Sequence, residues 1–263
     1  MNQRTPTALI TGASGGIGYE VAKLFAADHH NVVLVARSVG KLTKFADDLQ
    51  RQYGVSAKPI ALDLTAAPAP QFLFDQLQRE DMAVDVLVNN AGYGRMGRFS
   101  DLPLGDDLGQ IQLNVTALTH LTKLFLAPML ERRAGKILNV ASTAGFQPGP
   151  LMAVYYATKA YVISFSEALA NELQGSGVTV TCLCPGATDT GFQSRAGTEN
   201  TMLFRKLRPM NAETVARDGY RGLMAGNTLV ISGFRNWLLA EATRFGPRKL
   251  VTAISRKVMD QAK

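Results

Sequence analysis

A glycine-rich segment near the N-terminus constrains the fold more than any other feature of this chain. It reads Thr11-Gly12-Ala13-Ser14-Gly15-Gly16-Ile17-Gly18, between an apolar strand predicted over 7–11 and a helix predicted over 17–27. Glycines here let the backbone turn tightly and approach a phosphate group, while the helix N-terminus offers free N–H groups to an anion. The spacing Gly-x-x-x-Gly-x-Gly alone also fits an ordinary glycine turn. Its position between a first strand and a helix favours a nucleotide-binding loop.

The rest of the chain alternates strand and helix patterns. Further strands are predicted over 31–36, 56–64, 84–92, 135–142, 177–186 and 228–232, and further helices over 38–52, 70–79, 106–132, 153–174 and 211–225. Runs such as NVVLVA (31–36) are typical of parallel strands buried on both faces. The alternation therefore predicts an α/β fold: a doubly wound parallel sheet of about seven strands with helices on both sides.

Length and composition fit one globular domain. The chain has 263 residues, of which 46% are hydrophobic and 19% charged, which argues against disorder. No apolar run reaches the roughly 18 residues of a membrane-spanning helix, and the N-terminus enters a strand almost at once, so we expect a cytoplasmic protein. Cys182 and Cys184 fall on one face of a strand, where buried, reduced thiols are expected. The three histidines show no metal-ligand spacing, and no metal site is predicted.

The end of the second predicted strand distinguishes between the two nicotinamide dinucleotides. A chain that binds NAD places a carboxylate there for the ribose 2′-hydroxyl. Here the residues are Ala36, Arg37 and Ser38, and no acid occurs before Asp47. An acid would repel a 2′-phosphate, whereas the Arg37 guanidinium would bind it. A solvated arginine at a strand end is the alternative, but the missing acid and the present base both favour NADP.

A second group of residues suggests acid–base chemistry. Tyr155 and Lys159 are four residues apart on a predicted helix, so their side chains share one face. We expect the ammonium to lower the pKa of the phenol toward neutrality. Ser142 ends the preceding strand, at the sheet edge where ligands bind, and its hydroxyl can polarise a carbonyl. Tyr156 is also within reach of Lys159 by spacing, but we expect it to pack in the core.

These segments together resemble the short-chain dehydrogenase/reductase family, over about residues 5–190. The segments TGASGGIG (11–18), NNAG (89–92) and Ser142 with Tyr-x-x-x-Lys (155–159) are similar to its cofactor loop, its turn after strand four and its active site. The resemblance implies a Rossmann-type fold, binding of NADP(H), and a homo-oligomer, either dimer or tetramer. It implies the catalytic residues Asn114, Ser142, Tyr155 and Lys159, with Asn114 supporting a water-linked proton path to the lysine.

The same resemblance implies a set of cofactor contacts. Asp63 would lie beside the adenine ring, and Thr190 would contact the nicotinamide carboxamide. The full implied set is Gly12, Ser14, Gly16, Ile17, Gly18, Arg37, Asp63, Asn90, Ala91, Gly92, Tyr155, Lys159, Pro185, Gly186, Thr188 and Thr190.

The last quarter of the chain is strongly basic. Residues 1–194 carry 15 basic and 16 acidic side chains, whereas residues 195–263 carry 13 and 5. We expect a cofactor-binding and catalytic core over 1–186, a substrate loop and last strand over 187–232, and a basic, helical tail over 233–263. The tail either covers the substrate pocket or a subunit interface, or lies on a membrane surface. Nucleic-acid binding is not predicted, because no aromatic platform accompanies the charge.

The predicted function is NADP(H)-dependent hydride transfer between the nicotinamide and a carbonyl or alcohol of a small, hydrophobic molecule. A non-catalytic NADP-binding regulator on the same fold is the alternative, although the four implied catalytic residues are all present. A sugar-nucleotide epimerase also uses Tyr-x-x-x-Lys, but 263 residues leave little room for a sugar-nucleotide lobe.

Overall fold

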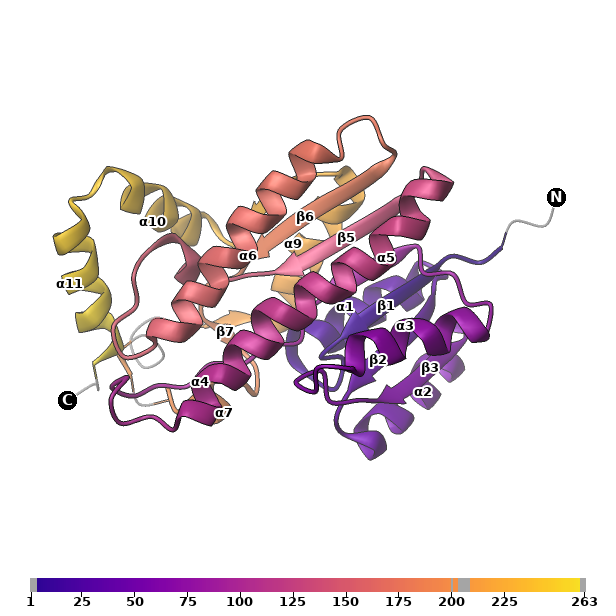
Figure 1. The fold of residues 1–263 in the computed structure, drawn as a ribbon, viewed down its shortest axis with the longest axis horizontal. Helices are drawn as coiled ribbons and strands as arrows, with labels where there is room; N and C mark the ends of the chain where they lie inside the picture. The colour runs from indigo at the N-terminus through magenta and orange to yellow at the C-terminus, as the bar shows by residue number, and fades with distance from the viewer. Residues whose placement is uncertain (1–3, 200, 203–208, 261–263) are drawn as a thin grey trace.

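The protein is built on one seven-stranded sheet in which every strand pairs in parallel with its neighbours (Figure 1). The computed structural model describes residues 4–199, 201–202 and 209–260. The order across the sheet is β3-β2-β1-β4-β5-β6-β9. The strands are β1 (Thr7–Thr11), β2 (Asn31–Ala36), β3 (Ala57–Ala61), β4 (Val86–Asn89), β5 (Gly135–Val140), β6 (Val178–Cys184) and β9 (Leu229–Ile231). The predicted Rossmann-type, doubly wound sheet is confirmed.

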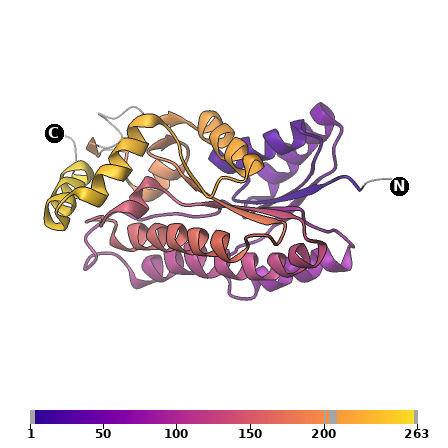
Figure 2. The ribbon, with the colours of Figure 1, turned by 90° about the horizontal axis from the view of Figure 1, so that it is seen from above.

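Helices cover both faces of this sheet (Figure 2). One face packs against α1 (Gly16–Ala27), α2 (Val39–Tyr53) and α9 (Ala212–Ala225). The other packs against α3 (Ala69–Arg79), α5 (Leu118–Arg132) and α6 (Ala153–Glu172). Along β1 the side chains alternate between the two cores: Ala8 and Ile10 enter one and Leu9 the other. Both cores are lined by apolar side chains, which explains the continuous hydrophobic runs of the strands.

The long helix predicted over 106–132 is observed with an interruption. It consists of α4 (Leu104–Ile111), a π-helical segment η1 (Gln112–Ala117) and α5. Asn114 lies inside the π-helical segment. Wider turns of this kind displace one residue from the regular helical pattern and often occur at functional sites. Apolar spacing does not reveal such a turn.

Several strands end earlier than predicted. The strands predicted over 56–64 and 84–92 stop at Ala61 and Asn89, and the following residues form loops at the carboxyl edge of the sheet. The segment 191–210, expected to be a loop, contains α7 (Phe192–Ala196). A two-stranded sheet, β7 (Thr188–Asp189) with β8 (Met210–Asn211), joins the two ends of this segment. The remainder of that loop lies largely outside the described residues.

The C-terminal tail forms the predicted helical pair, α10 (Phe234–Phe245) and α11 (Arg248–Met259), broken at Gly246-Pro247. The two helices extend beyond the carboxyl edge of the sheet, and α10 contacts the short helix η2 (Thr143–Phe146) (Figures 1 and 2). Within the described residues, no helix combines the length and the hydropathy needed to cross a bilayer. The division of the chain at 186 and 232 stays a prediction.

Candidate functional site

A cavity of about 1700 Å³ opens at the carboxyl edge of the sheet. Its wall begins at the glycine-rich turn after β1, crosses the ends of β2, β4, β5 and β6, and reaches α10 and α11. We call it the central cavity. Pockets for single small molecules usually have volumes of roughly 300–1,000 Å³. The central cavity therefore has room for a dinucleotide and a second molecule side by side.

The glycine-rich turn supplies a lining with little side-chain bulk. Gly12, Ser14, Gly16 and Ile17 line the central cavity, and Gly12 and Gly16 have left-handed backbones with φ of 68° and 56°. Helix α1 begins at this point with no side-chain cap and no acidic residue in its first turn. Its first N–H groups are therefore available to an anion such as a pyrophosphate, as the sequence predicts.

Gly18 is not among the residues that line the central cavity, and its predicted contact with the cofactor stays a prediction. A Cβ atom at this position would lie 2.4 Å from Nδ2 of Asn90 and 2.6 Å from the carbonyl oxygen of Gly12. The missing side chain thus allows α1 to pack directly against the turn. Gly18 shapes the cofactor loop from behind and makes no contact with the cavity.

Arg37, Ser38 and Lys41 line the central cavity beside the end of β2. Asp63 lines it as well, and its carboxylate accepts hydrogen bonds from the backbone N–H (3.0 Å) and hydroxyl (2.8 Å) of Thr65. Burial disfavours the charged carboxylate, but these hydrogen bonds and the Arg37 charge outweigh it and lower the pKa of Asp63. This end of the cavity therefore presents two cations and one ionised carboxylate.

The turn after β4 is tied to the glycine-rich turn by hydrogen bonds. Nδ2 of Asn90 donates to the carbonyl oxygens of Thr11 (2.9 Å) and Gly12 (3.3 Å). The Thr11 hydroxyl accepts from the backbone N–H groups of Asn90 (2.9 Å) and Ala91 (3.0 Å). Asn90, Ala91 and Gly92 all line the central cavity. The two predicted cofactor segments therefore form one rigid unit.

Ser142, Tyr155 and Lys159 meet on the wall of the same cavity. Ser142 follows β5, and its hydroxyl accepts a hydrogen bond from the N–H of Ala144 (3.1 Å), which holds the side chain at the start of η2. Tyr155 lies in the first turn of α6, and Nζ of Lys159 is 5.8 Å from the centre of its ring. The same Nζ donates to the carbonyl oxygen of Val140 (2.8 Å). The structure thus brings these three side chains together on one wall of the cavity, and their catalytic roles stay a prediction.

The protonation states of this group differ from the sequence expectation. Burial raises the pKa of Tyr155 above its usual 10.0, and the Ser142 hydroxyl only partly opposes this. The expected lowering by Lys159 is wrong for the protein without ligand, because desolvation of the phenolate dominates. Burial also lowers the pKa of Lys159 from 10.5 to about 8. Burial therefore keeps the Tyr155 phenol protonated, whereas Lys159 stays mostly charged at neutral pH and loses its proton above about pH 8.

Asn114 is placed behind this group and does not line the central cavity. Its amide accepts from the backbone N–H of Tyr93 (3.1 Å) and donates to the Tyr93 carbonyl (2.9 Å) and the Thr158 hydroxyl (3.0 Å). A Cβ atom on Gly92 would lie 3.0 Å from Oδ1 of Asn114 and 3.5 Å from Nζ of Lys159. Asn114 is thus a buried neighbour of the lysine, and its predicted part in a proton path stays a prediction.

The segment after β6 closes the cavity on its other side. Pro185, Gly186, Thr188 and Thr190 all line it. A residue missed by sequence analysis holds this segment: buried Gln193 donates to the carbonyl oxygen of Thr188 (2.6 Å) and accepts from the N–H of Thr190 (3.2 Å). Only the helix α7, which the sequence pattern did not indicate, brings Gln193 to this position.

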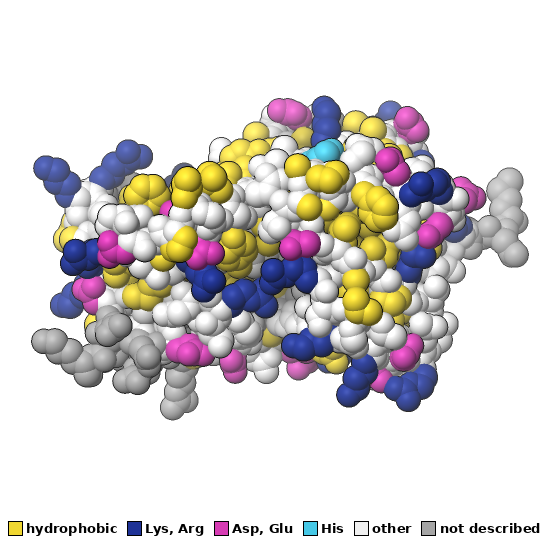
Figure 3. All heavy atoms as spheres, turned by 60° about the horizontal axis from the view of Figure 1, so that its bottom comes forward, with side chains coloured by type: hydrophobic (Ala, Val, Ile, Leu, Met, Phe, Trp, Pro, Cys, Tyr) yellow, Lys and Arg dark blue, Asp and Glu magenta, His cyan; other side chains and the backbone are white. Residues whose placement is uncertain are grey.

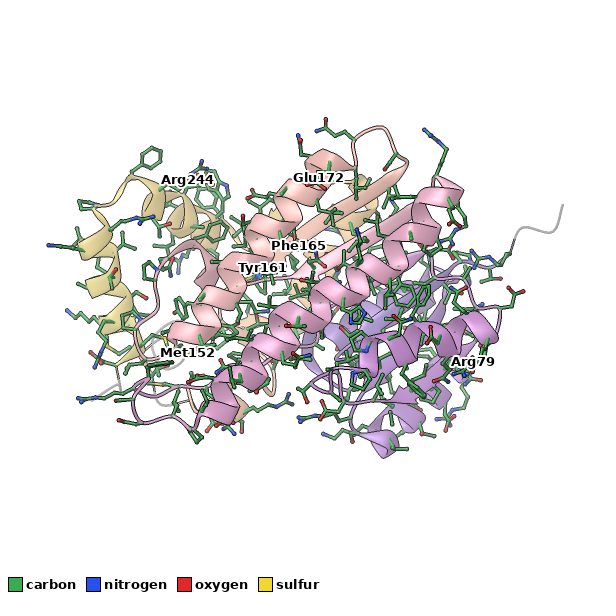
Figure 4. All side chains as sticks on the ribbon, in the orientation of Figure 1. Arg79, Met152, Tyr161, Phe165, Glu172 and Arg244 are labelled. Atoms are coloured by element: carbon green, nitrogen blue, oxygen red, sulfur yellow. The ribbon has the colours of Figure 1, made fainter. Side chains whose placement is uncertain are left out.

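Beyond Tyr155 the lining is apolar and comes from distant segments. Tyr156 packs as predicted, in a cluster with Met152, Ala196 and Met259, and it also lines the cavity. Figure 4 shows Met152 at the start of α6, on the side of the molecule where α11 lies. The sequence did not single out Phe192, which also lines this end. Further apolar lining comes from the C-terminal tail, which was expected to cover either the substrate pocket or a subunit interface; it includes Phe234, Leu239, Leu250, Val251, Ile254 and Val258.

Comparisons with known proteins agree with this arrangement. A family model described as short chain dehydrogenase matches residues 6–201. A solved short-chain dehydrogenase from Sphingobium yanoikuyae, in complex with NADPH, is 33% identical, covers 92% of this chain and 94% of its own, and superposes with a TM-score of 0.83. The bulky-bulky ketone specific alcohol dehydrogenase from Comamonas testosteroni is 31% identical over 93% of this chain and 94% of its own, with a TM-score of 0.78.

Among curated relatives, a very-long-chain 3-oxoacyl-CoA reductase from Anas platyrhynchos is 37% identical over 68% of this chain and 58% of the reductase. The chain spans between 53% and 68% of the length of the first five curated relatives that it matches.

Proposed function

The chain belongs to the short-chain dehydrogenase/reductase family of oxidoreductases, and we propose that it uses NADP(H) to reduce a carbonyl group of a bulky, hydrophobic molecule. One observation carries the proposal. Ser142, Tyr155 and Lys159 line the same cavity as the glycine-rich turn and Arg37. A site for a nicotinamide dinucleotide and a group able to exchange a proton are therefore continuous.

Each side chain has a defined task in this reaction. A nicotinamide cofactor, when bound in the cavity, would supply the hydride for the carbonyl carbon. Ser142 and Tyr155 hold the carbonyl oxygen by donating hydrogen bonds, and Tyr155 transfers its proton to that oxygen as the alcohol forms. The raised pKa of Tyr155 keeps the phenol protonated, which suits this donor role. Lys159 then stabilises the phenolate.

The proposed preference for NADP(H) rests on the cations at the end of β2. Arg37 and Lys41 both line the cavity there. A 2′-phosphate placed between them would form charge-assisted hydrogen bonds, which a 2′-hydroxyl cannot match. Asp63 is the acid of this wall, and its carboxylate is already engaged by Thr65.

The proposed substrate class follows from the far end of the cavity. The lining there is apolar, and α10 and α11 extend it well beyond Tyr155. A chain or ring system attached to the carbonyl would occupy this space. The solved relative is specific for bulky-bulky ketones, and the curated relative acts as a very-long-chain 3-oxoacyl-CoA reductase. Bulky ketones and long-chain 3-oxoacyl thioesters are therefore the first compounds to test.

The experiment measures NADPH oxidation at 340 nm against these compounds for the wild-type protein and Tyr155→Phe. We expect at least a hundredfold loss of kcat for the variant, with the NADPH dissociation constant changed by less than about threefold. The matched control is Tyr161→Phe, an exposed tyrosine on α6 whose hydroxyl contacts Thr119 and which does not line the cavity. Turnover of Tyr155→Phe at the wild-type rate would disprove the mechanism.

The alternative is a regulator that binds NADP(H) without turnover. It predicts tight NADPH binding but no oxidation with any compound of the panel. The buried, fully assembled group of Ser142, Tyr155 and Lys159 favours the enzyme, because a regulator has no use for an ammonium that burial makes unfavourable.

Assembly and location remain proposals. Exposed apolar side chains on α4 and α6, including Leu104, Leu108, Ile111 and Tyr161, support a homo-oligomer built through these helices. Tyr161 and Phe165, both labelled on α6 in Figure 4, stack their rings against each other. The cytoplasmic location expected from the sequence stays a prediction.

A further inference from the structure

Helices α10 and α11 expose more apolar surface than any other part of the described chain. Sixteen large hydrophobic side chains are exposed among the described residues, and seven of them lie on these two helices. These are Phe234, Trp237, Leu238, Leu239, Phe245, Leu250 and Ile254. The extreme case is Phe245, which is 86% exposed. An exposed apolar surface of this kind indicates a site of contact with another protein, a ligand or a membrane.

The substrate accounts for only part of this surface. Phe234, Leu239, Leu250 and Ile254 also line the central cavity, so a bound molecule would contact them. Trp237, Leu238 and Phe245 do not line it. Positions 234, 238 and 245, with Trp237 beside them, fall on one face of α10 by helical spacing. We call Trp237, Leu238 and Phe245 the outer patch.

The helical pair that carries the outer patch is also basic, and one of its cations, Arg235, lines the central cavity. The segment 234–260 carries six basic and two acidic side chains. The acids are paired, Glu241 with Arg244 and Asp260 with Arg256. No ion pair within the described ranges involves the other four cations, which are Arg235, Arg248, Lys249 and Lys257. Figure 3 shows Lys and Arg side chains gathered with hydrophobic ones at the end of the molecule formed by these helices.

We propose that the outer patch and its cations dock the protein onto the surface of an anionic lipid bilayer. The apolar side chains would enter the boundary between headgroups and acyl chains, and the four cations would contact lipid phosphates. A tryptophan suits this depth, because its ring is apolar and its N–H remains polar. The helices lie on the membrane in this arrangement and do not cross it.

A bilayer with anionic lipids would cover the apolar outer patch and neutralise the unpaired cations, whereas a second copy of the chain would only cover the patch. In a two-fold symmetric dimer the same patch occurs on both sides. Four unpaired cations of one copy would then face four of the other, without acids to neutralise them. Binding of a polyanion such as a nucleic acid would neutralise the charge but leave the outer patch in water.

Docking would also place the mouth of the cavity at the membrane. Four exposed large apolar side chains of the helical pair, namely Phe234, Leu239, Leu250 and Ile254, line the cavity. A hydrophobic carbonyl compound dissolved in the bilayer could thus reach Tyr155 without crossing water. This consequence rests on the proposed function, whereas the docking itself does not.

Trp237 provides a direct probe, because it is the only tryptophan of the chain. The full chain, loaded with NADP⁺, is mixed with vesicles of phosphatidylcholine containing 30% phosphatidylglycerol, or of phosphatidylcholine alone. We expect a blue shift of the Trp237 emission with the anionic vesicles, quenching by bilayer-embedded brominated lipid, and co-sedimentation. The neutral vesicles should bind at least tenfold more weakly.

Two variants separate the apolar and the electrostatic contributions. Leu238→Ser with Phe245→Ser should lower vesicle binding at least tenfold, since two exposed apolar side chains lose their insertion. Replacing Arg248 and Lys249 by Gln should lower binding about fivefold for each cation removed, at low salt. The control Phe72→Ser removes an apolar side chain that is 52% exposed on α3 and should leave binding unchanged.

The outcomes distinguish the membrane from a second copy. Vesicle pelleting without a Trp237 shift, or with equal binding by the Ser variant, would overturn the proposal. A dimer in vesicle-free sedimentation that dissociates in the Ser variant would assign the patch to subunit contact and overturn it as well. Neither measurement uses turnover, so lack of vesicle binding leaves the proposed reductase activity standing. Equally, lack of turnover leaves the docking result valid.

Discussion

Replacing Lys159 by Met should stabilise the ligand-free protein while it destroys the proposed site. Lys159 is 6% exposed, and burial lowers its pKa from 10.5 to about 8. At roughly 1.36 kcal/mol per pKa unit, holding this ammonium in the folded protein costs about 3 kcal/mol at neutral pH. Methionine has a similar shape and no charge. Its introduction leaves the Val140 carbonyl without its 2.8 Å partner, a loss of about 1 kcal/mol. The net gain is therefore about 2 kcal/mol.

The pH dependence makes this prediction specific. Below pH 8 the lysine is protonated in both the folded and the unfolded chain, so the full cost is present. Above the folded pKa of about 8 the native lysine loses its proton, and the cost disappears as the pH approaches 10.5. The stability of the wild-type protein should consequently rise relative to Lys159→Met between these values. The advantage of the variant should shrink to about zero near pH 10.

Urea unfolding of the reduced, ligand-free proteins, followed by circular dichroism from pH 7 to pH 10, measures this difference. The matched control is Lys123→Met, an exposed lysine on α5, whose difference from wild type should stay within about 0.5 kcal/mol at every pH. A Lys159→Met protein that is less stable than wild type at pH 7 would refute the reasoning. So would a stability difference that does not change with pH.

Three further substitutions test other parts of the site. In fluorescence titrations, Arg37→Ala should weaken NADPH binding about 10- to 100-fold and NADH binding less than about threefold. The control Arg51→Ala, at an exposed position, should change neither affinity. Equal losses for both dinucleotides would contradict the proposed role of Arg37 in binding the 2′-phosphate. Gly18→Ala should lower the free energy of unfolding in urea by about 1–3 kcal/mol and weaken NADPH binding, because the new Cβ would lie 2.4 Å from Nδ2 of Asn90. An unchanged unfolding midpoint would count against the packing role of Gly18. Asn114→Leu should cost about 2–4 kcal/mol in the same assay, since the partly buried Tyr93 N–H and carbonyl lose their partner and the buried Thr158 hydroxyl loses one of its two hydrogen bonds. A loss below about 1 kcal/mol would show that the π-helical segment holds without the amide.

Local sequence pattern was enough to predict most elements of the fold. Strands such as β2 are continuous β-branched runs, and α2 carries an apolar stripe of Leu42, Phe45, Ala46 and Leu49 that is buried as expected. Cys182 and Cys184 are buried and reduced, with their sulfur atoms 3.8 Å apart, as the same-face spacing indicated. The ends of the strands were predicted less well, because the hydrophobic run continues into loops that line the cavity.

The candidate site was predicted where its residues lie in short motifs. Ser142, Tyr155 and Lys159 come together because the end of a strand and the helix that follows it are close along the chain, which restricts how they can be arranged. Gly18 belongs to the glycine-rich motif and Asn114 was implied by the family resemblance, yet both lie behind the wall of the cavity. Gln193 had no local signal. The helical tail was predicted, but the choice between covering the pocket, a subunit interface and a membrane surface was left open, since it depends on how distant segments pack.

By itself, the amino-acid sequence determined the order of strands and helices, the glycine-rich turn and the pairing of Tyr155 with Lys159 along one helix. These properties depend on backbone geometry and on the spacing of residues only a few positions apart, so a short stretch of sequence is enough to predict them. The tertiary structure alone decided the protonation of the site, because the pKa values of Tyr155 and Lys159 follow from burial by segments remote in sequence. It also decided which apolar side chains of the C-terminal helices line the cavity and which remain exposed outside it. Desolvation and exposure are properties of the assembled fold, and no local pattern specifies them.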